Sequence, residues 1–443
     1  MRSYPPIDRF FSKRWAAPLS LLLLSLLIFL AYYKTIHGVF QLDDEVWITN
    51  NPMIRNLANL PAMLMGPRGF TTASLAINFA IGGLDVRGYH LVNIAIHILN
   101  AILVYILIAR TLVLTGFTLP RARLLSLSCA AIFSLHPVQT QAVAYIVQRM
   151  EIQSALFCLL ALVCFTTAAE AEAHAEKPLK KYIYYALIPL IYIAAFYSKE
   201  IAITLPALIL LYDAYFVSSF SPRKILEKWP LYAALFVLGI LFVVKTVAPL
   251  GGFSDVSKET AMATATVEVE EGKKYADLPA LQRFPTAGFG VPTTTPFQYF
   301  LTESNVILYY YALLILPINQ NIDYDFPVSK GLFELPRPGD GARLTIPLPW
   351  PALSILIHLS LIVLALCMFL RSYKKKGPAA KCASFFIIWF FIILSPTSSF
   401  IPIIDVIFEH RLYMASLGYA VILTLILNRV FAGKKTSPEN PAI

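Results

Sequence analysis

Charged side chains are scarce in this sequence. Asp, Glu, Lys and Arg make up 14% of the residues, whereas hydrophobic types make up 58%. Soluble globular domains carry about 25% charged residues, so the composition excludes an ordinary soluble domain and predicts a chain that lies in a membrane. Cysteine is also rare: the five cysteines all lie within or at the edge of apolar segments, where they behave as small hydrophobic side chains. This placement predicts no disulfide framework.

Two further signals are missing. No small-residue cleavage site follows the first apolar run, residues 16–33, which Lys13 and Arg14 precede. The run is therefore predicted to be a retained span and not a cleaved signal peptide. The sequence also shows no internal repeat, and its predicted cytoplasmic loops are too short for a folded domain. Any chemistry is therefore expected at the outer face of the membrane.

The apolar runs predict an all-α polytopic membrane protein, because a helix of about 20 residues spans the hydrocarbon core. We expect about ten spans, at residues 16–33, 91–108, 124–144, 152–168, 183–196, 201–216, 231–247, 351–370, 383–394 and 412–427. The basic residues collect in short loops between these runs, which is the pattern that sets orientation and not one that indicates nucleic-acid binding. Both termini are then cytoplasmic. The residues predicted to face the cytoplasm are Arg121, Arg123, Lys180, Lys181, Arg223, Lys224, Lys228, Lys374, Lys375, Lys376, Lys434 and Lys435.

Residues 1–431 are predicted to form a single membrane domain, followed by a cytoplasmic tail at 432–443. The first external loop spans residues 34–89, and residues 248–350 form further external loops. Within these, the polar stretch 257–279 is predicted to be mobile, because it has too few bulky apolar residues to pack a core. The apolar run 300–317 is predicted to be an interfacial or re-entrant helix, because a crossing there would invert the charge pattern that follows.

Three adjacent carboxylates, Asp43, Asp44 and Glu45, follow the first span in the run FQLDDEVWITNNP. One interpretation is a helix cap, in which an aspartate accepts hydrogen bonds from free backbone amides. A cap needs only one carboxylate. The other interpretation is a general base with a supporting partner at the boundary between water and membrane. A metal site would need more ligands than this loop offers, and the metal requirement stays open.

Other polar residues cluster at the outer ends of later spans. One such residue alone would indicate a helix cap, a snorkelling cation or a hydrogen bond between helices. Their repetition in successive turns favours one polar cavity lined by several helices. Cations there suit a phosphate, with Arg149, Lys199 and Arg411 as the candidates. The residues concerned are His90, His136, Arg149, Glu151, Lys199, Glu200, Glu409, His410 and Arg411. The pattern fits group transfer from a lipid phosphate, but composition alone does not separate that from anion transport.

Several long blocks carry a resemblance to a known family. They are FQLDDEVWITNNP, GYHLVNIAIHILNA, SLHPVQTQAVAYIVQRMEIQ, YSKEIAITLPALILLYD, LTESNVILYYYALLILPINQ and SSFIPIIDVIFEHRLYMASLGY, in that order. Between Phe40 and Tyr419 the chain resembles the membrane region of the transmembrane and tetratricopeptide-repeat O-mannosyltransferase-like family, and its bacterial branch in particular. The resemblance implies a GT-C-like fold and a polyprenyl-phosphate sugar as the donor substrate.

The family's diacidic motif falls on Asp43 and Asp44, which the resemblance makes the catalytic pair, with Asp43 preferred as the base. Its histidine-proline block falls on His136 and Pro137, and its Glu-x-Arg-x-Tyr motif on Glu409, Arg411 and Tyr413. Roles for the residues outside the diacid are our hypotheses. The full predicted substrate-binding set is Glu45, His90, His136, Arg149, Glu151, Lys199, Glu200, Glu409, His410, Arg411 and Tyr413.

The expected activity is transfer of a mannose-like hexose from the lipid donor to a hydroxyl group, with inversion at the anomeric carbon. Relatives usually continue into tetratricopeptide repeats, which this sequence lacks, so the acceptor is expected to be a protein or another glycan. The resemblance implies the bacterial inner membrane, with the active site facing the periplasm. A transporter or flippase for an anionic lipid-linked sugar is the main alternative, and a scaffold without chemistry is the third.

Overall fold

The computed structural model describes residues 6–173, 178–247, 291, 294–337, 344–375 and 377–431. These residues form helices joined by turns and loops, and they contain no strand. The prediction of an all-α chain is therefore confirmed. The predicted mobile stretch 257–279 and the predicted tail 432–443 lie outside the described residues.

Among the described residues, seven helices are long and apolar enough to cross a membrane, as expected for a multi-pass protein. They are Ala16–His37, Val86–Leu114, Ile146–Glu172, Leu179–Phe196, Glu200–Val217, Pro351–Ser372 and Glu409–Phe431. Three shorter apolar helices are Gly69–Gly82, Trp229–Lys245 and Pro378–Leu394. Two of these coincide with the predicted spans 231–247 and 383–394, whereas the third lies in the predicted external loop. The count of ten crossings stays a prediction, as does the interfacial placement of α14 (Pro296–Ile315), which is not one of the seven.

The helices divide into two compact units. The first comprises Met1–Phe236, Leu361–Leu394 and Glu409–Ile443, and the second comprises Val237–Ser360 and Ser395–Phe408. The boundaries fall inside α12 (Trp229–Val247) and α15 (Pro351–Lys375), and α14 belongs to the second unit. The first unit contains α1 (Pro6–Ser12), α2 (Ala16–Tyr32), α3 (Leu60–Met65), α4 (Gly69–Gly82), α5 (Val86–Leu114), α6 (Leu119–Leu135), α7 (Thr140–Ala144), α8 (Arg149–Ala173), α9 (Pro178–Phe196), α10 (Leu205–Tyr212), α11 (Pro222–Leu226), α16 (Pro378–Leu394) and α17 (Leu412–Phe431).

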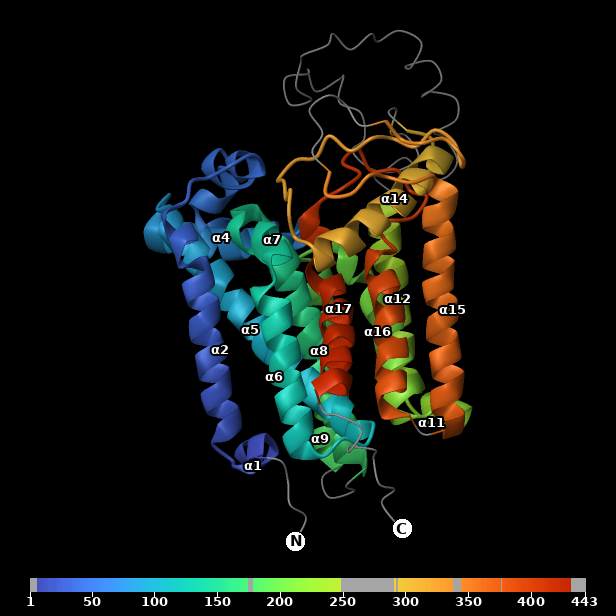
Figure 1. Cartoon of the computed structure of the whole chain (residues 1–443). Helices are drawn as coiled ribbons and strands as arrows, with labels where there is room; N and C mark the ends of the chain where they lie inside the picture. Colours follow the sequence, from blue (N-terminus) through green and yellow to red (C-terminus); the bar gives the residue numbers. More distant parts are fainter. Residues whose placement is uncertain are drawn as a thin grey trace. The chain divides into compact units, whose positions relative to one another are not determined.

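Helix α5 is the centre of the first unit, where it packs against α2, α6 and α8 (Figure 1). Its 29 residues give a length of about 44 Å, more than the hydrocarbon core of a bilayer. Asn93, His97 and Asn100 are fully buried and follow one face of α5 at intervals of four and three residues. The Asn93 side chain donates to the carbonyls of Val143 and Ile146, at 3.2 Å each. These polar groups fix the neighbouring segments against α5.

The two ends of this bundle carry different residues. Helices α4 and α7 lie at one end and α1 at the other (Figure 1). At the α1 end, Arg121 pairs with Asp8 at 3.6 Å and Arg123 donates to the carbonyl of Phe11 at 2.9 Å. Helix α6 is about 25 Å long, and His136 follows its last residue at the end opposite to Arg121 and Arg123. Arg121 and Arg123, predicted to be cytoplasmic, are thus separated from His136, predicted to be external, by the length of α6, although the orientation itself stays a prediction.

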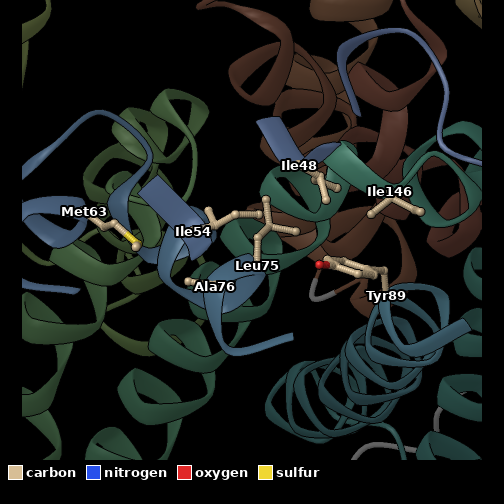
Figure 2. Packing of buried hydrophobic residues seen from close by; sticks show 7 residues of the cluster. All are labelled: Ile48, Ile54, Met63, Leu75, Ala76, Tyr89 and Ile146. Atoms are coloured by element: carbon tan, nitrogen blue, oxygen red, sulfur yellow. The ribbon is translucent and has the colours of Figure 1, made fainter. Parts of the chain in front are cut away.

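The loop that carries the diacid rests on a small hydrophobic core. Ile48 from this loop packs with Leu75 and Ala76 of α4, Tyr89 of α5, and Ile146, as Figure 2 shows. Ile54 and Met63 extend the same cluster. Burial of side chains from four segments stabilises one conformation of the predicted external loop. That loop is therefore largely folded, with α3 and α4 inside it.

Candidate active site

Asp43 and Asp44 lie in opposite environments although they are neighbours in the sequence. Asp44 is 1% exposed, whereas Asp43 lies at the surface. The Asp44 carboxylate accepts hydrogen bonds from the backbone amides of Gln41, at 3.0 Å, and Val147, at 2.7 Å. Burial raises the pKa of Asp44 to about 6, while these two donors and the charge of Arg149 oppose the rise. The helix-cap interpretation is wrong for Asp44, because its carboxylate does not cap the following helical turn Glu45–Thr49.

The turn between α7 and α8, residues 145–148, holds both aspartates. The backbone amide of Asp43 donates to the hydroxyl of Tyr145 at 2.8 Å, and Tyr145 is only 8% exposed. Burial and then the negative charge of Asp43 raise the pKa of Tyr145, and the hydroxyl also interacts with the Asp43 side chain. Two residues later, Val147 donates to Asp44. One short turn therefore orients an exposed carboxylate beside a buried one.

The same α7–α8 turn leads to a buried cation. The Lys199 ammonium lies 2.7 Å from the Glu151 carboxylate and 3.3 Å from the side-chain oxygen of Gln148. The Glu151 side chain is 1% exposed and that of Lys199 13% exposed. Burial lowers the pKa of Lys199, while the charge of Glu151 opposes this. The ammonium is thus held in a place where water screens it weakly.

Further cations gather around Lys199. The positive charges of Lys199, Arg411 and Arg68 all act on His410, whose backbone amide and ring Nδ1 donate to the Gln141 side-chain oxygen at 2.7 and 3.0 Å. Glu409, His410 and Arg411 form a short helical turn in which all three are at least 95% buried. The charge of Lys199 therefore reaches His410 in this turn, while the role of the group as a binding site stays a prediction.

Arg68 joins the cations to the diacid loop. Its guanidinium forms an ion pair with Glu200 at 3.2 Å and lies 5.7 Å from the ring centre of Trp47, which follows Asp44 by three residues. The acids and the cations therefore lie at the same end of the first unit, linked by the Trp47–Arg68 contact and by the α7–α8 turn. An exposed carboxylate at the same end of the unit as several cations could deprotonate one group while the cations stabilise an anionic leaving group.

Arg149 was predicted to bind a phosphate in a polar cavity, but its side chain lies among buried protein groups. Its side chain is fully buried, and its Nε donates to Asn93 Oδ1 at 2.8 Å. Its Nη1 donates to the carbonyl of Ser74 at 3.2 Å and its Nη2 to that of Tyr89 at 3.0 Å. The guanidinium thus ties α4 and α5 to the start of α8. The predicted contact of Arg149 with a phosphate has no support in this geometry.

Tyr413 also lies inside the helix bundle. Its hydroxyl is 2.6 Å from His97 Nδ1 and accepts from Asn100 at 2.9 Å, while His97 Nε2 lies 2.9 Å from the carbonyl of Ser134. If His97 Nε2 carries the proton that Ser134 accepts, Nδ1 accepts from Tyr413. The hydroxyl is therefore engaged by α5, and Tyr413 is fully buried.

The remaining predicted residues divide between surface and core. Glu45 is exposed. His136 is half-buried; its Nδ1 accepts from the amide of Val138 at 3.2 Å and its ring packs edge-on against Tyr419. His90 is 3% exposed, and neither of its ring nitrogens has a hydrogen-bond partner among the described residues. The structure thus brings the cations together, whereas Glu45 is exposed and His136 is half-buried.

Two residues of the site were missed by sequence reasoning, Tyr145 and Arg68. Arg68 had a signal, because it adopts a left-handed backbone with φ 52° inside the turn Gly66-Pro67-Arg68-Gly69. A Cβ atom at Gly69 would lie 2.4 Å from the carbonyl of Met63, so only glycine fits there. The turn residues glycine and proline around Arg68, directly before a helix, could have indicated this position from the sequence. Tyr145 had no such signal, because its role depends on a partner 102 residues away.

Metal binding has no candidate cluster in this part of the molecule. Within the described ranges, no group of three or more His, Cys, Asp or Glu side chains lies close enough together to hold a metal ion.

Comparison with known proteins shows which proteins this chain resembles. No family model and no solved structure matches the chain. The chain is 25% identical to the mouse protein O-mannosyl-transferase TMTC4 over 436 residues, which cover 89% of the chain and 53% of the mouse protein. It is 35% identical to Drosophila melanogaster protein O-mannosyl-transferase Tmtc1 over 156 residues, and 33% identical to mouse TMTC2 over 110 residues. The chain is thus similar to the TMTC protein O-mannosyl-transferases.

This relationship confirms the family resemblance predicted from the sequence blocks. The matches cover 17% of the fly protein and 12% of mouse TMTC2, so the chain spans about half or less of the TMTC relatives it matches. The bacterial branch stays a prediction, because the TMTC relatives named above are animal proteins.

Proposed function

We propose that the protein is a GT-C glycosyltransferase that moves a mannose-like hexose from a polyprenyl monophosphate to a hydroxyl group of a protein acceptor. The observation that carries the proposal is the contrast within the diacid: Asp43 is exposed at the surface, whereas Asp44 is buried and hydrogen-bonded. The names of the relatives support the sugar and the acceptor, because each is a protein O-mannosyl-transferase. The lipid donor follows from the family resemblance.

Asp43 acts as the base in this proposal. Its carboxylate takes the proton from the acceptor hydroxyl while the oxygen attacks the anomeric carbon of the donor. The bond between that carbon and the phosphate oxygen breaks, and its electron pair leaves with the polyprenyl phosphate. A single displacement of this kind inverts the anomeric centre. Asp44 supports the base by holding the loop, since its carboxylate is already occupied by two backbone amides.

Lys199, Arg411 and Arg68 stabilise the departing phosphate. Negative charge grows on the phosphate oxygen as the bond breaks, so nearby cations bind the transition state more strongly than the bound donor. These three cations act together on His410, which supports a common location. Arg149 is not assigned to this group, because its donors are engaged by Asn93, Ser74 and Tyr89.

The site is proposed to face the outside of a bacterial inner membrane. The separation of Arg121 and Arg123 from the diacid loop along α6 supports this orientation, because basic loops mark the cytoplasmic side. The donor phosphate would then lie at the outer headgroup level, with the isoprenoid tail in the bilayer.

The test is transfer of label from a polyprenyl-phosphate [14C]mannose donor to a peptide rich in serine and threonine. Purified wild-type protein should move label to the peptide, and Asp43→Asn should lower the rate ~100 to 10,000-fold while the donor still binds. Asp85→Asn is the matched control, because Asp85 is an exposed carboxylate of the same predicted external loop, 34–89, and belongs to no predicted site. Label that stays on the lipid with every acceptor, or full turnover by Asp43→Asn, contradicts the proposal. A flippase would move the intact lipid across vesicles without releasing the sugar.

A further inference from the structure

The Tyr145 hydroxyl contacts Asp43 from another part of the chain. It accepts a hydrogen bond of 2.8 Å from the Asp43 backbone amide, which lies 102 residues earlier in the sequence. It also interacts with the Asp43 side chain. Because Asp43 lies in an exposed loop, this contact joins a surface carboxylate to the packed interior of the first unit.

Tyr145 itself is held rigidly. It is 8% exposed and belongs to the turn whose next residues, Ile146 and Val147, are fully buried. Ile146 packs in the hydrophobic core shown in Figure 2, and its carbonyl accepts from Asn93 of α5 at 3.2 Å. Packing therefore fixes the position of the Tyr145 hydroxyl, and the hydrogen bond to this hydroxyl fixes the Asp43 backbone in turn.

The chemistry of the hydroxyl fits both contacts. A phenol oxygen accepts one hydrogen bond while its own proton remains available for donation. The amide of Asp43 occupies the oxygen as donor, which leaves the phenol proton for the carboxylate of the same residue. A carboxylate that receives one hydrogen bond keeps its second oxygen for an incoming hydroxyl group. The titratable groups that face Tyr145 are Asp43 and Asp44.

We propose that Tyr145 is a positioning residue that orients Asp43 for proton abstraction from the acceptor. The inference rests on the proposed function, because it assigns Tyr145 to the reaction in which Asp43 is the base. Tyr145 touches neither sugar nor phosphate in this scheme. It acts through Asp43, by fixing the loop backbone and by directing one carboxylate oxygen.

The experiment compares Tyr145→Phe with wild type in the transfer of label from polyprenyl-phosphate [14C]mannose. Phenylalanine keeps the ring and removes only the hydroxyl. The turnover number should fall about 10- to 100-fold, because a displacement of about 1 Å in a reacting group costs that much. The donor KM should stay within about twofold, because the cations that bind phosphate are unchanged.

Two further variants separate positioning from a general loss of structure. Tyr89→Phe is the matched control, because Tyr89 is a buried tyrosine of the hydrophobic core in Figure 2 whose hydroxyl donates to the carbonyl of Gly83 at 3.0 Å. It should keep turnover within about twofold of wild type. The double variant Asp43→Asn with Tyr145→Phe, measured in single turnover, should be no slower than Asp43→Asn alone, because Tyr145 has lost the group through which it acts.

The outcomes distinguish this inference from the proposed function. Wild-type protein that releases no label from the lipid overturns the proposed function, and the inference with it. Wild-type activity together with unchanged turnover in Tyr145→Phe overturns the positioning role alone. Independent, multiplying losses in the double variant, or a loss in Tyr89→Phe equal to that in Tyr145→Phe, would show that the hydroxyl matters only for folding.

Discussion

The Asp44 carboxylate accepts a hydrogen bond of 2.7 Å from the backbone amide of Val147, although 103 residues separate them. The same carboxylate accepts from the amide of Gln41 in its own loop. Asp44 therefore clamps the loop after the first span onto the turn before α8. Its neighbour Asp43 is left at the surface, so the two members of the diacid differ in exposure and in hydrogen bonding.

The clamp makes a prediction about stability and pH. The pKa of Asp44 is raised to about 6 from an ordinary 3.8, so the folded protein binds this proton more tightly than the unfolded chain does. The stabilisation from the protonated group is complete below pH 3.8 and is lost as the pH rises through about 6. The difference corresponds to about 3 kcal/mol. Asp44→Asn should remove this pH-dependent loss of stability. Unfolding temperatures measured between pH 4 and pH 8 check the prediction.

Asp85→Asn is the control for the Asp44 experiment. Asp85 is an exposed carboxylate whose pKa the hydrogen bonds from Arg87 lower, so its contribution has the opposite sign and is lost as the pH falls. A wild-type profile that Asp44→Asn leaves unchanged between pH 4 and pH 7 would contradict the raised pKa of Asp44.

The buried ion pair between Glu151 and Lys199 gives a second prediction. Glu151→Gln removes the charge that compensates an ammonium group of which the side chain is only 13% exposed. The free energy of unfolding should fall by about 3–5 kcal/mol, because an uncompensated charge remains in a place that water reaches poorly. Thermal unfolding in detergent measures the loss. Glu227→Gln, which breaks the exposed pair with Arg223, should change stability by less than about 0.5 kcal/mol. Equal losses in the two variants would contradict the burial argument.

Sequence reasoning predicted that several polar groups gather at one end of the bundle, because successive spans of a polytopic protein run in alternate directions. The end of α9 and the beginnings of α8 and α17 then have to meet at one end of the bundle, and Lys199, Glu151 and His410 do meet there. The all-α fold followed from the apolar runs for the same reason: a backbone in lipid satisfies its own hydrogen bonds by forming helices.

What sequence reasoning could not predict is which polar groups are already engaged. Arg149 and Lys199 have the same charge and similar positions in the sequence, yet the partners of Arg149 come from α4 and α5, up to 75 residues away. Lys199 forms an ion pair with a carboxylate, whereas Arg149 donates hydrogen bonds to two backbone carbonyls and a side-chain amide oxygen. The difference depends on side-chain packing between helices, which no local pattern records.

The engagement of Arg149 predicts a loss of stability and no change in donor binding. Arg149→Lys keeps the positive charge, but one ammonium group cannot reach Asn93, Ser74 and Tyr89 together, because their acceptors match the fork of a guanidinium. The free energy of unfolding should fall by about 2–4 kcal/mol as buried acceptors lose their donor. The donor KM of the folded variant should stay within about twofold of wild type. A KM that rises tenfold with unchanged stability would restore the predicted phosphate contact.

Tyr413 gives the last prediction. Its hydroxyl lies between His97 Nδ1 and the Asn100 amide in the middle of the bundle. Tyr413→Phe leaves both partners without their hydrogen bond in a buried place, which should cost about 1–3 kcal/mol in the free energy of unfolding. The double variant with His97→Phe should lose less than the sum of the two single losses, because the two side chains share one interaction. Thermal unfolding measures the cycle, and label transfer at saturating donor should remain near the wild-type rate. A fall in transfer without a fall in stability would place Tyr413 at the substrate, as its position in the family motif first indicated.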